Sequence, residues 1–246
     1  MVPLILAIDT SGKSTSIALA RGADLIASVV IPPDEKRSET LWSDVQSLLT
    51  EPGLRIEGVD VFAACVGPGG FTGLRVGMAT LKGFSMAGGK PLIGVTSLQA
   101  SAYGIEAQKR VCVLLNAYKG EVYSQLFRIE SDGVPNAENE PFISNLENAL
   151  LRVESYDELV FVGDGAVANW DKISSENAQR DKRWALDLGD RRLAEAIAQL
   201  AYVRYERGEM ETAESLKACY VRPSEAEIKL SLGLLGSKIK RSMKQQ

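Results

Sequence analysis

The stretch Val66-Gly67-Pro68-Gly69-Gly70-Phe71-Thr72-Gly73-Leu74-Arg75-Val76-Gly77 decides how this chain folds. Ten of the 22 glycines lie between Gly67 and Gly104, so backbone constraints are concentrated there. An apolar run, 61–66, precedes the glycines, and a segment compatible with a helix, 74–87, follows them. This order predicts a buried strand, a tight turn and a helix. Glycines in such a turn adopt positive φ angles, or let another backbone or a ligand approach closely.

The start of this helix, and the face that its glycines share, follow from the same residues. Thr72 is a good N-cap, and Phe71 and Val76 then have the N′ and N4 spacing of a hydrophobic staple. Gly73 and Gly77 lie four residues apart, on one helix face. Because a glycine inside a helix costs about 1 kcal/mol relative to alanine, the pair predicts close approach of a neighbouring helix or strand.

The composition is that of a globular protein without histidine. The 246 residues are 45% hydrophobic and carry a formal net charge of −4, and a chain of this length forms one large domain or two lobes. The lack of histidine excludes histidine-containing triads and most catalytic zinc sites. Cys65, Cys112 and Cys219 are odd in number and widely spaced, which predicts buried thiols in a reducing compartment.

The two ends of the chain bear on its location. The first residues lack a basic region and reach Asp9 too early for a signal peptide. No run approaches the ~20 apolar residues of a membrane span. We therefore expect a cytoplasmic protein with no membrane contact. The tail, 228–246, is basic and is expected to be mobile.

The opening residues predict a strand, a hairpin and two further strands of a mixed sheet, over 4–8, 16–20 and 25–31. Gly12 and Lys13 resemble part of a P-loop. That motif needs a glycine at position 7 and a helix after the lysine, whereas the chain has Ala7 and a strand. Asp9 at the end of the first strand fits a phosphate-binding hairpin of actin-like ATPases, and equally a turn that satisfies local backbone donors.

The helix expected before the glycine turn, 38–49, has an apolar face at helical spacing. Its members are Leu41, Trp42, Val45, Leu48 and Leu49. Trp42 widens the stripe beyond what one packing face needs, which leaves a partner surface open. In the helix after the turn, Arg75 and Lys82 lie seven residues apart and therefore on one side. The sequence allows equally that this side faces solvent or that it contacts a partner.

A second strand–turn–strand unit repeats the opening of the chain. Its strands are expected at 111–116 and 121–128, followed by an acidic, mobile loop at 131–141 and a late helix at 191–207. Alternating strands and helices favour a partly parallel α/β sheet. The repeat predicts two lobes, at 1–108 and 109–227.

Five motifs occur in order along the chain: LAIDTS at 6–11, the glycine turn at 66–77, KPLIGVTSL at 90–98, GEVY at 120–123 and YVRPSEAE at 220–227. Together they resemble the TsaB (YeaZ) family. The resemblance implies the actin-like fold of the sugar kinase and chaperone ATPase superfamily, with two ribonuclease-H-like lobes, each with a mixed sheet. Two positions depart from the family: Asn116 replaces a common acidic residue, and Arg37-Ser38 stands where a histidine is common.

The resemblance also implies a function. A TsaB-like chain is a non-catalytic subunit, a pseudo-enzyme, that binds and activates a TsaD-type paralogue, which transfers a threonylcarbamoyl group to an adenosine next to the anticodon of tRNAs. A TsaE-type ATPase completes the complex, tRNA is reached through it, and a homodimer forms when the partner is absent. No cofactor or metal is expected. TsaD-type chains bind metal through paired histidines, and this chain has no histidine. The implied interface is Leu41, Trp42, Val45, Phe71, Thr72, Gly73, Leu74, Arg75, Gly77, Met78 and Lys82.

The alternative is an active small-molecule kinase or ATPase of the same fold. It would use Asp9, Ser11 and Gly12 at phosphates and Asp164 near a metal ion. In a pseudo-enzyme these four residues form a vestigial nucleotide site. The second lobe favours the pseudo-enzyme, because Asn116 in its turn is not acidic. The glycines of 66–77 are then interpreted as packing against a partner helix.

Overall fold

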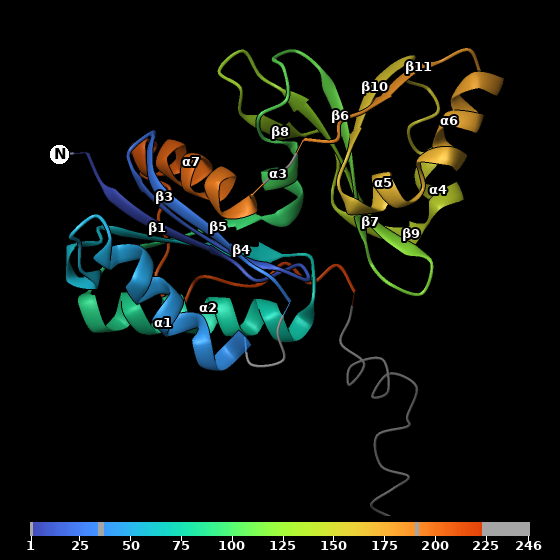
Figure 1. The fold of residues 1–246 in the computed structure, drawn as a ribbon. Coiled ribbons are helices and arrows are strands. Elements are labelled where there is room, and N and C mark those ends of the chain that lie inside the picture. Colours follow the sequence, from blue (N-terminus) through green and yellow to red (C-terminus); the bar gives the residue numbers. More distant parts are fainter. Residues whose placement is uncertain (1, 34–36, 190–191, 223–246) are drawn as a thin grey trace, which may run out of the picture.

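The computed structural model describes residues 2–33, 37–189 and 192–222, which form two lobes (Figure 1). The strands are β1 (Leu4–Asp9), β2 (Thr15–Arg21), β3 (Asp24–Ile31), β4 (Val61–Gly67), β5 (Leu92–Thr96), β6 (Arg110–Asn116), β7 (Glu121–Ile129), β8 (Pro135–Ala137), β9 (Phe142–Asn145), β10 (Glu158–Val162) and β11 (Arg183–Leu186). The helices are α1 (Arg37–Thr50), α2 (Phe71–Gly88), α3 (Ser97–Ala102), α4 (Leu146–Leu151), α5 (Asp164–Ala168), α6 (Trp170–Gln179) and α7 (Leu193–Glu206), with one 3-10 turn, η1 (Ile56–Gly58).

The two sheets repeat one topology. The first has the strand order β3-β2-β1-β4-β5, and the second has the order β11-β10-β6-β7-β8, with β9 also paired to β7. In each sheet an antiparallel hairpin, β1–β2 or β6–β7, carries parallel strands on its first member. The predicted α/β fold, with its repeated strand–turn–strand units and mixed sheets, is therefore confirmed.

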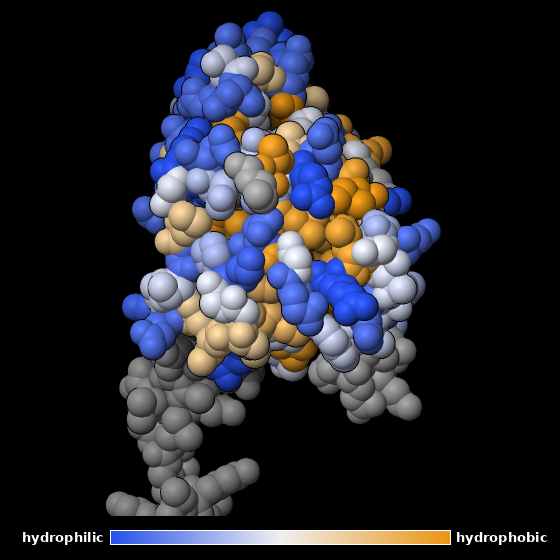
Figure 2. Space-filling model, turned by 90° about the vertical axis from the view of Figure 1, so that its left-hand side faces the viewer, coloured by the Kyte–Doolittle hydropathy of each residue, from blue (hydrophilic) through white to orange (hydrophobic). Residues whose placement is uncertain are grey.

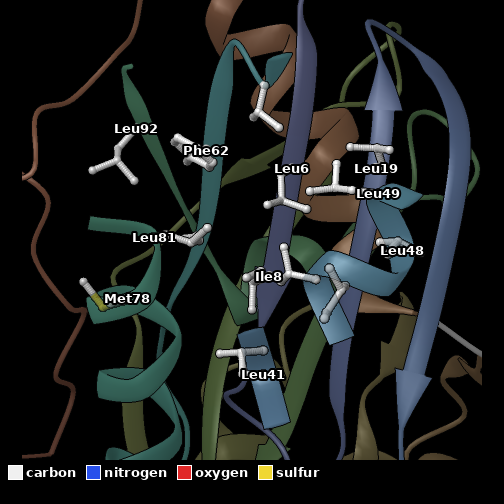
Figure 3. Close-up of a cluster of buried hydrophobic side chains, with 14 of the residues drawn as sticks. Leu6, Ile8, Leu19, Leu41, Leu48, Leu49, Phe62, Met78, Leu81 and Leu92 are labelled. Atoms are coloured by element: carbon white, nitrogen blue, oxygen red, sulfur yellow. The ribbon is translucent and has the colours of Figure 1, made fainter. Parts of the chain in front are cut away.

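Helices cover both faces of the first sheet. On one face α1 and α2 enclose a core in which Leu41, Leu48, Leu49, Met78 and Leu81 point toward side chains of the strands (Figure 3). On the other face lies α7, whose alanines pack on the small residues of β1, β2 and β4. The predicted helix at 38–49 is confirmed, and its apolar face is directed into its own lobe.

The chain returns to the first lobe after completing the second. Helix α7 contacts β1, β2 and β5, and Leu216 lies in the core beneath α1 and α2. The expected second lobe, 109–227, is therefore not one continuous unit, because the stretch from α7 to Leu216 packs with the first lobe. A further prediction was incomplete: the acidic loop at 131–141 contains strand β8. The basic tail, 228–246, lies outside the described residues.

A C-terminal strap, residues 211–222, ties the lobes together. Glu211 pairs with Leu92 at the edge of the first sheet through two backbone hydrogen bonds. The backbone N–H of Cys219 donates to the carbonyl of Val66 at 2.7 Å. Arg222 then forms an ion pair with Glu121 of the second lobe. The strap thus runs along the first lobe and ends on the second.

The glycine turn packs α2 on the end of β1. A Cβ atom on Gly73 would lie 2.1 Å from the carbonyl oxygen of Thr10, and one on Gly77 would lie 2.3 Å from its Oγ1. The Thr10 hydroxyl, which is buried, donates to the carbonyl of Gly73 at 2.7 Å. The predicted close approach is therefore confirmed, but the neighbour is Thr10 of the same chain, directly after β1. The interpretation that these glycines face a partner helix is wrong.

The predicted start of α2 is wrong by two residues. The N-cap is Gly70, and Phe71 already belongs to the helix, so Thr72 lies in the first turn. The backbone N–H of Gly70 donates to the carbonyl of Ser11 at 2.8 Å, and Gly69 presses against the same residue. This contact fixes the turn at Gly70, so the N-cap of α2 lies two residues before Thr72, and Thr72 is not the cap. Phe71 stacks on Tyr220 of the strap, with ring centroids 5.4 Å apart. The end of the helix at Gly88-Gly89 is as predicted, with Gly89 at a φ of 62°.

No helix in the described part of the chain is long and apolar enough to cross a membrane. Figure 2 shows the side of the first lobe near the N-terminus, where hydrophobic residues reach the surface between hydrophilic ones.

Two glycines of α2 should respond to alanine in opposite ways. Gly73→Ala places a methyl group against a backbone carbonyl that cannot rotate away, so we expect the free energy of unfolding to fall by about 3 kcal/mol. Gly83 is exposed and has open space around it, so Gly83→Ala should raise that free energy by roughly 0.5–1 kcal/mol. Chemical denaturation measures both, and equal effects at the two positions would contradict the packing described.

Candidate functional site

A cavity of about 690 Å³ lies between the lobes. It brings together all four residues predicted for a nucleotide site: Asp9, Ser11 and Gly12 from the first lobe, and Asp164 from the second. Asp9 ends β1, Ser11 lies two residues after it, and Asp164 begins α5 shortly after β10. The cavity thus lies at the carboxyl ends of strands from both sheets, where open α/β sheets bind their ligands.

The side chains at the ends of β1 and β6 hold two similar turns. Asp9 Oδ1 accepts a hydrogen bond from the backbone N–H of Ser11 at 2.9 Å. In the second lobe, Asn116 Oδ1 accepts from the backbone N–H of Tyr118 at 2.8 Å. Asp164 Oδ1 accepts from the backbone N–H of Asn116 at 2.9 Å. The interpretation of Asp9 as the acceptor of a local turn is therefore confirmed, and Asn116 takes the equivalent place in the second lobe.

Charged groups of both signs line the cavity. Lys13 and Arg192 offer cations, whereas Asp9, Asp164 and Asp187 offer carboxylates. In the ranges that the structure describes, no cluster of three or more cysteine, aspartate or glutamate side chains is placed to hold a metal ion. The arrangement suits a polar ligand that carries an anionic group near Lys13.

The thiol beneath the first turn is kept neutral. Cys65, on β4, is buried, and burial raises the pKa of its thiol well above the ordinary value, with the charge of Asp9 raising it further. Burial also raises the pKa of Cys112 to about 12. Cys219, in the strap, is half-buried, and its pKa is raised by burial and by Glu140. All three cysteines are free, as the sequence predicted.

The residues predicted for a partner interface divide into two groups. Buried in the chain's own core are Leu41, Val45, Leu74, Gly77 and Met78. At the surface, fully or in part, are Trp42, Phe71, Thr72, Gly73, Arg75 and Lys82. The buried residues cannot contact a partner, because the first sheet already covers them. Lys82 is also engaged within the chain, since its Nζ donates to the carbonyl of Leu216 at 2.8 Å.

Sequence reasoning missed the residues that α2 turns outward. Ala79, Gly83 and Met86 are exposed on this helix, and Met86 retains 75% of its accessible surface. They continue the line of Thr72 and Arg75 at three- and four-residue spacing, which places them on one face. That spacing is visible in the sequence. It was missed because the larger apolar residues of the opposite face give the stronger helical pattern.

Comparisons with known proteins agree with one another. A family model described as "TsaD: tRNA N6-adenosine threonylcarbamoyltransferase" matches residues 28–155. The chain is 28% identical over 232 residues to the tRNA threonylcarbamoyladenosine biosynthesis protein TsaB of Escherichia coli, covering 92% of this chain and 97% of that protein. YeaZ from Pseudomonas aeruginosa superposes with a TM-score of 0.73 at 26% identity, covering 89% of this chain and 99% of that one. A ROK family protein from Streptococcus pneumoniae, at 9% identity and a TM-score of 0.51, shares the fold alone.

The three thiols should differ in reactivity. At pH 8 we expect a small disulfide reagent to label Cys219 slowly, and Cys65 and Cys112 only when the chain unfolds. Their burial blocks access and their raised pKa values suppress the reactive thiolate. Labelling followed by peptide mass spectrometry identifies the sites. Labelling of Cys65 in the native chain as fast as Cys219 would contradict the buried turn.

Proposed function

The chain belongs to the family that the TsaD model describes and, within it, to the TsaB (YeaZ) members, and from that premise we propose that it is a non-catalytic subunit. It would bind and activate a TsaD-type threonylcarbamoyltransferase in making threonylcarbamoyladenosine in tRNA. The relatives that carry the TsaB name are described as tRNA threonylcarbamoyladenosine biosynthesis proteins. The proposed process, tRNA threonylcarbamoyladenosine biosynthesis, rests on the description of these relatives. The proposed role as a binding subunit rests on the exposed surface of α2.

The observation that carries this proposal is the outward face of α2. Gly83 lies on it with open space around its Cα atom, yet a glycine there costs about 1 kcal/mol in helix stability relative to alanine. No contact with the described residues of the lobe accounts for that cost, whereas Gly73 and Gly77 are explained by Thr10. A helix of another chain that approaches α2 closely at Gly83 and Ala79 would account for it.

Apolar side chains flank this close approach. Met86 lies one turn from Gly83, and burying a methionine side chain contributes about 1.5–3 kcal/mol. Trp42 of α1 is 46% exposed and packs on Phe84 of α2, with ring centroids 5.3 Å apart. The two helices therefore present one continuous surface. The proposed interface comprises Trp42, Phe71, Thr72 and Arg75 of the predicted set together with Ala79, Gly83 and Met86.

The remaining parts of the proposal follow from the family. A TsaE-type ATPase would join the complex, tRNA would be reached through it, and the site of action would be the cytoplasm, where tRNA is modified. In the absence of a partner, the same face of α1 and α2 would pair two copies of this chain, since exposed apolar patches favour association.

One observation favours a second candidate, an active small-molecule kinase or ATPase. Asp9, Ser11, Gly12 and Asp164 do line one cavity. Against it, an oxygen of each carboxylate already accepts a backbone hydrogen bond, and the carbonyl of Ser11 is bonded to Gly70. Isothermal titration of the isolated chain with ATP and magnesium decides the matter: tight binding with turnover would establish the enzyme and overturn the pseudo-enzyme.

The outward face of α2 is tested by two substitutions that spare the core. Gly83→Leu adds bulk where close approach is proposed, and Met86→Asp places a charge in an apolar contact. Each should weaken binding to the TsaD-type protein of the same organism at least tenfold, or about 1.4 kcal/mol, and lower tRNA modification in a reconstituted reaction. Titration calorimetry with the purified partner measures the affinity.

Arg55→Ala is the matched control, because Arg55 is an exposed arginine between α1 and η1 and belongs to neither helix of the proposed interface. It should leave affinity unchanged. Gly83→Leu should melt at or above the temperature of the unaltered chain, because leucine forms helix better than glycine. Met86→Asp should melt slightly below it, because a carboxylate in the last turn of α2 is unfavourable. Unchanged affinity for both Gly83→Leu and Met86→Asp would show that the partner binds elsewhere.

A further inference from the structure

A second hollow, of about 560 Å³, lies where α2, the second lobe and the strap meet. Pro68, Leu74, Ala117 and Val221 contribute to an apolar lining, together with the rings of Phe71, Tyr118, Tyr123 and Tyr220. Among the residues that the structure describes, its charged lining residues are Arg75 and Arg222. It is thus an apolar groove with a cationic rim on a chain whose formal net charge is −4.

Arg75 is held in place by aromatic rings. Its guanidinium carbon lies 3.8 Å from the centroid of the Phe71 ring, and its Nε donates to the hydroxyl of Tyr220 at 3.5 Å. Phe71 in turn stacks on Tyr220. A guanidinium stacked in this way is ordered before any ligand arrives, which lowers the entropy cost of binding.

The two cations of the groove are in different situations. Arg222 is paired with Glu121. Arg75 lines the groove and has no ion-pair partner among the residues that the structure describes. Arginine and tyrosine at the edge of an apolar pocket are the residue types enriched among binding hot spots.

Resting on the function proposed above, we infer that this groove receives a segment of the TsaD-type partner that carries a carboxylate beside an apolar side chain. The carboxylate pairs with Arg75, and the apolar side chain enters the groove between Phe71, Tyr118 and Tyr220.

The lining and the position of the groove favour a protein segment over a nucleic-acid phosphate. A phosphate backbone is bound by several cations spread along a track, whereas this groove offers one unpaired cation in an apolar wall. Phe71 and Arg75 also lie on the first two turns of α2, so the groove continues the outward face that carries Ala79 and Gly83. A partner seated on that face would reach the groove without leaving the surface.

The test is the affinity of the full chain for the TsaD-type protein of the same organism, compared for Arg75→Ala, Arg75→Lys and Tyr220→Ala. We expect Arg75→Ala and Tyr220→Ala to weaken binding about tenfold or more, and Arg75→Lys to recover only part, because lysine does not reproduce the stacked fork. The loss for Arg75→Ala should shrink as salt is raised, since it removes a charge pair. Arg55→Ala, an exposed arginine elsewhere, should change nothing.

The outcomes separate this inference from the function on which it rests. If Met86→Asp weakens binding while Arg75→Ala and Tyr220→Ala do not, the groove is not part of the interface and this inference alone is wrong. If the unaltered chain does not bind the partner at all, both are wrong. If Arg75→Ala spares the partner but weakens tRNA binding by the complex, the groove takes a phosphate and the inference is overturned. Circular dichroism confirms that each variant is folded.

Discussion

The contact between Thr10 and the two glycines of α2 is the constraint on which the first lobe depends. Thr10 directly follows β1, the central strand of the first sheet, and its carbonyl and hydroxyl occupy the space that Cβ atoms on Gly73 and Gly77 would need. With the helix held this close, Leu74, Met78 and Leu81 reach the core, and Ser11 meets the glycine turn at Gly69 and Gly70. The same contact fixes which face of α2 is exposed to the proposed partner.

The second lobe contains a similar close contact between glycines at a helix start and the end of a strand. Gly163, at a φ of 101°, and Gly165 lie so close to the carbonyl of Leu114 that Cβ atoms would stand 2.4 and 2.8 Å from it. Leu114 lies near the end of β6, the counterpart of β1. In both lobes, therefore, a glycine turn presses a helix start against the end of the first strand. The cavity forms between these two ends, and the strap joins the lobes beside it.

Most of the fold was predictable, because strands, hairpins and helices are written in local patterns. The apolar runs at 4–8 and 16–20 and the apolar face of 38–49 predicted the correct elements. The start of α2 was not predictable from Thr72, since the bond between Gly70 and Ser11 joins residues far apart in sequence. The neighbour of Gly73 could not be identified from the sequence either. The four-residue spacing of Gly73 and Gly77 indicates a close neighbour but does not show which residue it is. For the same reason the return of α7 to the first lobe was missed. The structure brings Asp9, Ser11, Gly12 and Asp164 together because the ends of β1 and β10 face the same cavity.

The glycines of α2 connect the fold to the proposed function. Gly73 and Gly77 pack inward on Thr10 and fix the position of the helix, whereas Gly83 faces outward, toward the proposed partner.

The most direct test is a double-mutant cycle on unfolding free energy with Thr10→Ala and Gly77→Ala. Gly77→Ala alone should be strongly destabilising, because its methyl group meets Thr10 Oγ1. In the Thr10→Ala background that oxygen is gone and the nearest remaining atom, Cβ, lies 3.4 Å away, so the added cost should fall, giving a coupling of about 1 kcal/mol or more. Costs that simply add, within about 0.5 kcal/mol, would contradict the claim that Thr10 is what these glycines accommodate.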